Sequence, residues 1–331
     1  MSKDGLKTKE KTTSKINAQT IGNLAPYIGL VLVVVVFAIW TKGQLLSVQN
    51  LQSLTSQIIV TALATIGAVF VFGAGYFDMS MGGSVCFSAV LGAMASIATG
   101  SIVVGILVIF GISLAFGFFK GLFAAFVNVP FFIFTIVLGS VMSSLVITIL
   151  GTKSIIKLSD AVAPLPNPDF TQMSIINVIC LVVFFLACLF LFNYTPLGIK
   201  VKNMGGNIIA AKQSGINTTL TTITVFIISA FGLGLAAFLT MLRTQTVGTG
   251  TAGTLGNDVM VALVLGGMPL SGGPRSKISA GIIGAATITF LNSGLSIIGL
   301  NTGQIQICRG LVFIAVVFIS SFSYRGKLLP R

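Results

Sequence analysis

The stretch "TALATIGAVFVFGAGYFDMSMGGSVCFSAVLGAMASIA", residues 61–98, joins two apolar runs through a glycine-rich break. The break, Gly73–Gly83, contains Asp78, which is the only acid between Glu10 and Asp160. A charged side chain in hydrocarbon costs several kcal/mol, so such a residue has either a function or a structural partner. This pattern of apolar run, break and apolar run indicates membrane-spanning helices with an interruption.

Composition places most of the chain in lipid. Of its 331 residues, 55% are hydrophobic and only 8% are charged, whereas soluble domains carry about 25% charged residues. A membrane-spanning helix needs about 20 mostly apolar residues, and a barrel would show alternating polarity. We expect an all-α, polytopic transmembrane helix bundle of about ten spans with broken helices. The expected spans are 24–41, 53–73, 83–100, 102–127, 131–151, 174–194, 219–241, 258–269, 278–299 and 303–323.

Basic residues predict the orientation of the bundle. With the N-terminus inside, thirteen Lys and Arg residues fall in inside loops. Four fall in outside loops, namely Lys42, Lys153, Lys157 and Arg243. This asymmetry follows the positive-inside rule and predicts that both termini are cytoplasmic. It also accounts for the net charge of +13 without a nucleic-acid partner.

The sequence divides into a tail and one membrane domain. Residues 1–20 are polar and basic, and we expect them to form a cytoplasmic tail before a single transmembrane domain over 21–331. The first apolar run is longer than most signal-peptide cores and lacks a small-residue cleavage site, which indicates a retained span. The domain contains a proline-containing outside loop over 152–172 and a cytoplasmic loop over 195–218.

The sequence shows no recognisable set of residues for catalysis or metal binding. It has no His, and its four Cys lie in apolar runs without a CxxC pair. No Walker A motif is present either, so this chain is not expected to hydrolyse ATP by itself. We expect no catalytic residue, no metal and no cofactor.

Four ionisable residues fall within the expected spans or their breaks. Asp78 either has a functional role or caps the helix that restarts near Met79, by accepting backbone N–H bonds. Asp258 allows the same two roles at the eighth span, which is too short to cross the membrane alone. Lys120 is expected to extend toward the cytoplasmic interface. Arg309 either pairs with an acid or reaches a lipid headgroup.

Two further breaks in the apolar pattern each allow two interpretations. "VNVPFFIFTIVLGS", residues 127–140, presents Phe131, Phe132 and Phe134 after a proline, and these rings either line a path for sugars or face lipid. The segment 265–273 has the same form as the break at 73–83. The similarity marks either a degenerate internal repeat or a chance match.

The cytoplasmic loop contains a short capped helix. In "NIIAAKQSG", Asn207 is placed to cap a helix and Gly215 to end it. Its apolar and alanine face has no lipid to bury itself in, so docking onto a partner protein is favoured over a helix that lies flat on the membrane surface.

Five motifs in the same order resemble the membrane permease subunit of bacterial ABC importers of the ribose/galactose/xylose type. The similarity extends from about residue 53 to 320. The motifs are "GYFDMSMGGS" (75–84), "NVPFFIFTIVLG" (128–139), "MGGNIIAAKQSGI" (204–216), "ALVLGGMPLSGG" (262–273) and "LNSGLSIIG" (291–299).

The resemblance implies a multi-pass protein of the bacterial cytoplasmic membrane. It implies a second permease copy or paralogue, cytoplasmic ABC ATPase subunits and an extracytoplasmic sugar-binding protein as partners, and a small neutral carbohydrate as substrate. The segment Gly205–Ile216 is then the coupling helix. The residues expected to serve ATPase coupling are Gly205, Gly206, Asn207, Ala210, Ala211, Ser214 and Gly215, and those expected on the substrate pathway are Asp78, Ser80, Phe131, Phe132, Thr135, Asn257 and Asp258.

One departure from the family pattern stands in the coupling segment. Ile208 and Ile209 occupy the positions where the family has two acids, which predicts a more apolar ATPase contact or a divergent partner.

Three further functions are compatible with the sequence. The same import mechanism also suits a nucleoside or a furanose-like signalling molecule. Two functions of different classes are an ion-coupled secondary transporter, and a membrane scaffold or sensor that transports nothing.

Overall fold

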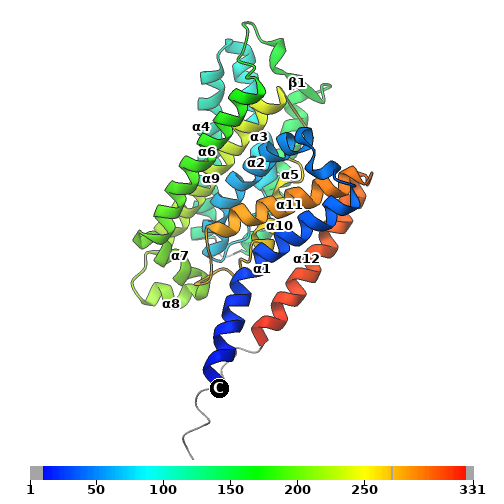
Figure 1. The fold of residues 1–331 in the computed structure, drawn as a ribbon. Helices are drawn as coiled ribbons and strands as arrows, with labels where there is room; N and C mark the ends of the chain where they lie inside the picture. Colours follow the sequence, from blue (N-terminus) through cyan, green and yellow to red (C-terminus); the bar gives the residue numbers. More distant parts are fainter. Residues whose placement is uncertain (1–9, 128, 270, 326–331) are drawn as a thin grey trace, which may run out of the picture.

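The computed structural model describes residues 10–127, 129–269 and 271–325, and the side chains of 24–127, 129–269 and 271–318. Its helices form one elongated bundle (Figure 1). The helices are α1 Glu10–Trp40, α2 Val48–Gly73, α3 Met81–Thr99, α4 Ile102–Phe126, α5 Phe131–Leu150, α6 Phe170–Asn193, α7 Pro196–Gly206, α8 Ile208–Gln213, α9 Thr218–Thr244, α10 Leu255–Leu265, α11 Ser279–Ile297 and α12 Thr302–Arg325, with short 3-10 turns at Gln44–Leu46 and Leu158–Asp160.

Seven of these helices are long and apolar enough to cross a membrane, namely α2, α3, α4, α5, α6, α9 and α11. Three shorter apolar helical segments cover Leu24–Trp40, Leu255–Leu265 and Thr302–Phe318. The all-α membrane bundle is therefore confirmed for the described residues, apart from one short strand pair. The total of ten spans stays a prediction.

The centre of the bundle is the contact between α2 and α9. Along their most apolar windows these helices are 78% and 72% buried, whereas α4, α5 and α6 are each only 22% buried. Glycines permit the close approach, since a Cβ added at Gly67 would lie 3.0 Å from Ser229 Cα. Small residues serve this purpose in membrane helices because they let backbones pack closely.

Two helices, α3 and α10, begin inside the bundle after non-helical segments. Residues 74–80 lead into α3, and residues 249–254 lead into α10. The two starts meet, because a Cβ at Gly82 would lie 2.8 Å from the Ala252 carbonyl oxygen. Helix α10 has only 11 residues, which confirms that the eighth expected span is too short to cross alone.

The glycine-rich segments 73–83 and 265–273 are neighbours in space. Gly273 N–H donates to the Gly73 carbonyl over 3.0 Å. The internal repeat of these two segments stays a prediction.

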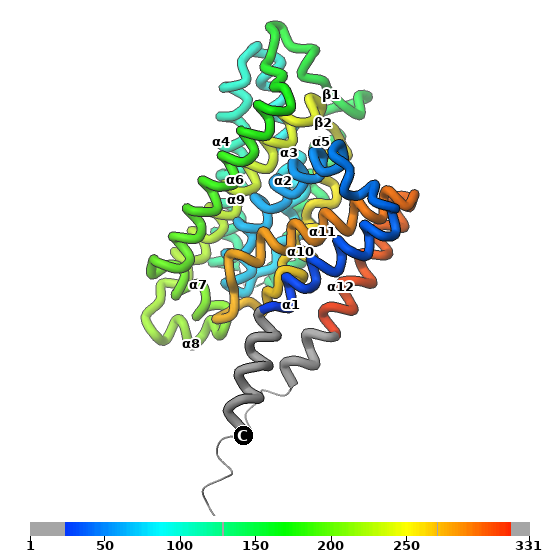
Figure 2. Tube along the Cα trace, viewed as in Figure 1, coloured from blue at the N-terminus to red at the C-terminus, as the bar shows by residue number. Residues whose placement is uncertain are grey.

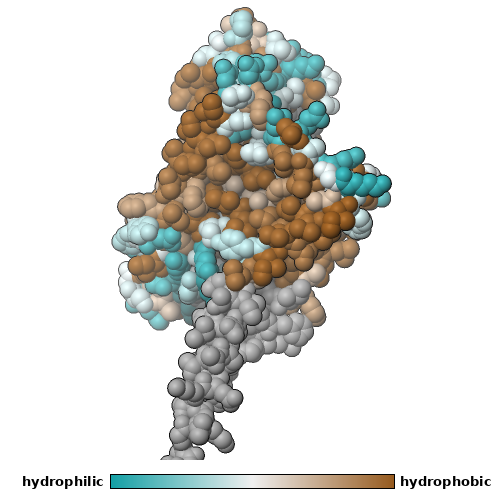
Figure 3. All heavy atoms as spheres, in the orientation of Figure 1, coloured by the Kyte–Doolittle hydropathy of each residue, from teal (hydrophilic) through white to brown (hydrophobic). Residues whose placement is uncertain are grey.

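The two ends of the bundle differ in structure. The short helices α7 and α8 lie at one end, toward which residues 24–40 of α1 and 302–318 of α12 also lead (Figures 1 and 2). The opposite end carries the antiparallel pair of β1 Ile155–Lys157 and β2 Thr246–Gly248. A hydrophobic band separates the more polar ends (Figure 3). This is the arrangement expected of a protein embedded in a bilayer.

Two helical segments lie outside the expected elements. Helix α1 begins at Glu10, so part of the expected tail over 1–20 is helical, whereas residues 1–9 lie outside the described residues. The loop over 195–218, which is predicted to be cytoplasmic, contains a further helix, α7, which Thr195 caps by accepting from Leu197 N–H and which has Pro196 in its first turn. Proline suits that position because its missing N–H would have no helical acceptor there.

Candidate functional site

Asp78 lies in the extended break before α3 and is enclosed by protein. One carboxylate oxygen accepts from Ser80 N–H at 2.8 Å and from Ser80 Oγ at 2.6 Å. The other accepts from Lys120 Nζ on α4 at 2.6 Å. The side chains of Lys120 and Asp78 are 2% and 0% exposed. This arrangement holds the break against α4 by a fully desolvated ion pair, whose attraction is strong because water is excluded.

Helix α5 contacts the same break. The Thr135 hydroxyl oxygen lies 3.1 Å from Met79 N–H, which it accepts, and 2.9 Å from the Phe132 carbonyl, to which it donates. Phe131 is 9% exposed and packs on the rings of Tyr76 and Phe226 at centroid distances of 5.6 and 5.0 Å. Phe131 and Thr135 thus fix the position of α5, and Phe132 is exposed.

Asp258 forms a second buried ion pair, with Arg309 on α12. It also accepts from the Thr254 hydroxyl at 2.9 Å and from Asn292 Nδ2 at 3.3 Å. The group is not fully satisfied, because Arg309 Nε and Asn292 Oδ1 are buried without a hydrogen-bond partner among the described residues. Asn257 is exposed on the neighbouring position of α10.

Two sequence-based interpretations, those of Lys120 and Asp258, are corrected by these contacts. Lys120 does not extend to the interface, because the buried carboxylate of Asp78 offers it a closer partner. Asp258 does not cap α10, since that helix begins at Leu255 and Asp258 lies within its first turn. The capping interpretation of Asp78 is confirmed for the Ser80 N–H, which its carboxylate accepts, although the residue at the cap position of α3 is Ser80. For Arg309, the structure selects the acid over a lipid headgroup.

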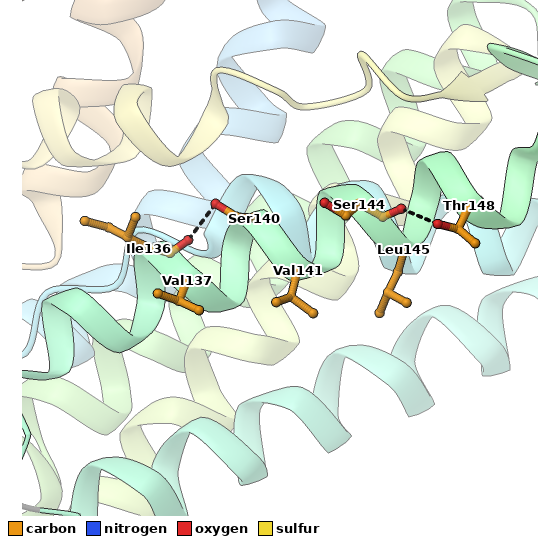
Figure 4. Close-up of a pocket in the computed structure, with 7 residues that line it drawn as sticks. All are labelled: Ile136, Val137, Ser140, Val141, Ser144, Leu145 and Thr148. Carbon is orange, nitrogen blue, oxygen red and sulfur yellow. Dashed lines mark hydrogen bonds between the residues drawn. The ribbon is translucent and has the colours of Figure 1, made fainter.

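The outer face of α5 carries a stripe of hydroxyl groups. Ser140, Ser144 and Thr148 follow one edge of the helix, beside the apolar side chains of Val141 and Leu145 (Figure 4). A shallow groove of about 390 Å³ lies along this face. Ser140 Oγ donates to the Ile136 carbonyl at 3.1 Å, and Thr148 Oγ1 to the Ser144 carbonyl at 3.0 Å. Each of these hydroxyls retains acceptor capacity for a ligand.

The short helix α8 has the expected form. Asn207 Oδ1 accepts from Ile209 N–H and Ala210 N–H, both at 3.0 Å. Gly215 follows the helix with φ +79°, a left-handed conformation that glycine adopts without steric cost. Ala211 is buried, whereas Ile208 and Ile209 are 44% and 67% exposed. The helix therefore presents an apolar surface at the end of the bundle.

The structure brings together four of the seven expected pathway residues, but these four are buried. Asp78, Ser80, Phe131 and Thr135 form one buried cluster, and the break that holds Asp78 and Ser80 adjoins the start of α10. Asn257 and Phe132 are exposed, and Asp258 is enclosed with Arg309. The hydroxyl stripe on α5 is not among the predicted residues, although its spacing of four residues at 140, 144 and 148 is visible in the sequence.

Comparison with known proteins places this arrangement in a family. A family model described as "Branched-chain amino acid transport system / permease component" matches residues 50–319. The chain belongs to this permease family. The permease match extends from residue 50 of α2 through residue 319 of α12, and includes both breaks, the α5 groove and α8.

Relatives of this permease match it over nearly their whole length. It is 28% identical to the xylose transport system permease protein of Haemophilus influenzae, over 90% of this chain and 96% of the relative. It is also 28% identical to the galactose/methyl galactoside import permease protein of Escherichia coli, over 90% and 93%. The ribose import permease protein of Bacillus subtilis is 26% identical over 89% and 92%. No solved structure matches the chain.

The comparisons confirm the resemblance carried by the five motifs. With seven helices that meet the criteria for spanning a membrane, the permease is a multi-pass protein of the cytoplasmic membrane. Family membership assigns no catalytic step to the chain, because a permease component forms the membrane passage.

Proposed function

We propose that this chain is the permease subunit of a binding-protein-dependent ABC importer for a small neutral carbohydrate, such as ribose, galactose or xylose. Separate ATPase subunits supply the energy, and an extracytoplasmic binding protein delivers the sugar. The full-length similarity to permeases named for xylose, galactose and ribose supports the class of substrate.

The two buried ion pairs support the proposal that the substrate is neutral. Asp78 and Asp258, the two acids that are buried in the described part of the bundle, are each held in an ion pair. Neither carboxylate is free to bind a cationic substrate or a coupling ion, and neither cation is free to bind an anion. An ion-coupled transporter needs such a group at mid-membrane, so the two pairs favour the ABC importer over ion coupling.

The α5 groove is the best-supported wall of the substrate path. Its exposed hydroxyls alternate with apolar side chains, and this combination suits a sugar, which presents both hydroxyl groups and C–H faces. In the proposed assembly, the groove faces a second permease copy or paralogue, and the sugar passes between the two subunits. Phe132 and Asn257 are exposed and available to the path, whereas Asp78, Ser80, Phe131 and Thr135 shape it from behind.

Helix α8 is proposed to dock into the ATPase subunit. Its apolar face is exposed at the end of the bundle where basic residues gather, which is the end predicted to be cytoplasmic. Ile208 and Ile209 supply the exposed surface, so the complementary site on the ATPase is expected to be apolar. Burial of such side chains contributes roughly 1.5–3 kcal/mol each.

Reconstitution tests the proposal. The permease is combined with its ATPase and binding protein in proteoliposomes, and uptake of radiolabelled ribose, galactose and xylose is measured with and without ATP. We expect ATP-dependent uptake of at least one of these sugars that resists ionophores. Uptake that persists without ATP and collapses with an ionophore would establish an ion-coupled transporter.

Two further outcomes distinguish the substrate from the class of protein. Uptake of a nucleoside or a furanose-like signalling molecule, but of none of the three sugars, would keep the mechanism and replace the substrate. One relative is named as an autoinducer 2 import permease, which makes this measurement worthwhile. Binding of the ATPase with no uptake of any candidate would support a scaffold or sensor.

A further inference from the structure

Helix α7, which precedes α8, is attached to the membrane bundle at both of its ends through glycine. A Cβ added at Gly198 would lie 1.7 Å from the Phe192 carbonyl oxygen of α6. A Cβ at Gly205 would lie 2.0 Å from the Gly73 carbonyl oxygen and 2.5 Å from Gly273 N. These distances are too short for any side-chain carbon, so α7 touches the bundle backbone against backbone.

Three segments meet at Gly205. They are the end of α2 at Gly73, the end of α7 at Gly205, and the loop between α10 and α11 at Gly272 and Gly273. Gly273 N–H donates to the Gly73 carbonyl at 3.0 Å, and a Cβ at Gly272 would lie 2.2 Å from the Phe72 carbonyl oxygen. We name these four residues, Gly73, Gly205, Gly272 and Gly273, the glycine junction.

The glycine junction connects α8 with two non-helical parts of the bundle, namely the break before α3 and the loop between α10 and α11. On one side, only Gly206 and Asn207 separate Gly205 from the first residue of α8. On the other side, Gly73 leads directly into the extended segment that holds Asp78, and Gly273 belongs to the loop between α10 and α11. Closely packed contacts transmit displacement because they shift between discrete arrangements and do not deform gradually.

We propose that Gly205 is a positioning residue that makes α8, the break before α3 and the loop after α10 move as one rigid unit. A displacement of α8 by the ATPase then shifts the starts of α3 and α11 together, and so changes access to the path. The inference rests on the proposed function, since it takes α8 as the ATPase contact. It adds the route by which that contact reaches the membrane interior.

A glycine-to-alanine series in the reconstituted transporter tests the inference. Gly205→Ala adds one methyl group with no room to accommodate it. We expect normal assembly with the ATPase, but at least tenfold lower uptake and tenfold lower stimulation of ATP hydrolysis by loaded binding protein. Gly111→Ala is the control, because nothing lies within 4 Å of a Cβ there, and it should behave as the unmodified protein.

The neighbouring glycine sharpens the series. A Cβ at Gly206 would lie 3.6 Å from Pro274 Cδ, which is ordinary van der Waals contact. Gly206→Ala should therefore lose less uptake than Gly205→Ala. Equal uptake and stimulation for Gly205→Ala and Gly111→Ala would overturn the inference.

A distance measurement tests the rigid unit without any substitution in the glycine junction, and it remains usable if Gly205→Ala fails to assemble. Spin labels are placed at the exposed positions Lys212 on α8 and Ser271 in the loop, after the four native cysteines are replaced by alanine. We expect the same inter-label distance in the nucleotide-free and ATP-trapped complexes. A change larger than the width of the distribution overturns the rigid unit while leaving the proposed function intact. A complex whose ATPase is never stimulated overturns both.

Discussion

The two buried ion pairs occupy comparable places in the bundle but differ in how completely the protein encloses them. Asp78 lies three residues before α3, and Asp258 lies in the first turn of α10. The side chains of the Asp78–Lys120 pair are 0% and 2% exposed, and those of the Asp258–Arg309 pair are 11% and 8% exposed. Only the second pair has buried polar neighbours without partners in the described structure.

This difference separates a sealed structural contact from a looser one. In the first pair, Ser80 and Lys120 together satisfy both carboxylate oxygens of Asp78. In the second, the guanidinium and the Asn292 amide keep unused hydrogen-bonding capacity. Removing one partner from a fully enclosed pair leaves an uncompensated charge, whereas a looser site can rearrange. The first pair should therefore be the less tolerant of substitution.

The largest effect is expected for Lys120→Met. The change leaves the carboxylate of Asp78 buried without its cation, which destabilises proteins by about 3–5 kcal/mol. Thermal unfolding of the purified protein in detergent should show this as a large drop in melting temperature.

The control for Lys120→Met is the double variant Asp78→Asn with Lys120→Met. The amide of Asn can still accept the Ser80 N–H, and no charge remains buried, so most of the lost stability should return. A double variant as unstable as Lys120→Met alone would contradict the account of this pair.

Arg309→Gln should cost less than Lys120→Met. It also removes the cation from an acid, but Asp258 keeps its hydrogen bonds from Thr254 and Asn292. We expect a loss of about 2 kcal/mol, near the cost of an unsatisfied buried polar group. The same unfolding measurement checks it, and a loss equal to that of Lys120→Met would remove the distinction between the two pairs.

Asn292→Leu should have a small effect on stability. The amide gives one hydrogen bond to Asp258 but has a buried oxygen without a partner in the described structure. The substitution loses one hydrogen bond but also removes a buried oxygen that has no partner. Because these two effects oppose each other, we expect the free energy of unfolding to change by about 1 kcal/mol or less. A loss above that of Arg309→Gln would show that the amide, and not the guanidinium, holds the site together.

The smallest effect on stability is expected for the uncharged face of α5. Ser144→Ala leaves both ion pairs untouched, so its unfolding should match that of the unmodified protein, while uptake of the transported sugar falls severalfold. Ser143→Ala is the matched control, because Ser143 lies on the same helix outside the groove. Equal uptake by the two variants would count against α5 as a wall of the path.

The sequence predicts the membrane class, most helix positions and the caps of α8, because these depend on local properties. Length of an apolar run decides whether a helix can span lipid, and Asn207 and Gly215 form caps from neighbouring backbone atoms. The boundary of α1 and the presence of α7 are not predicted. Both lie in polar segments, where apolar periodicity gives no signal.

The site is predicted less completely than the fold. Asp78 is unusual from its apolar surroundings alone, and one of its two hydrogen-bonding partners, Ser80, follows it closely. The role predicted for Lys120 is wrong because 42 positions separate it from Asp78. Hydropathy indicates that a charge is buried in the membrane but says nothing of which distant charge lies beside it.

By itself, the sequence determined that this protein is a helical membrane permease with the short capped helix α8, since hydrophobic length, cap residues and motif order can be read directly from the sequence. Only the tertiary structure decided that Asp78 pairs with Lys120, that Asp258 pairs with Arg309, and that the residues of the glycine junction meet at one point. Ion pairs and backbone contacts act over a few ångströms, and helix packing alone brings residues so distant in sequence within that range.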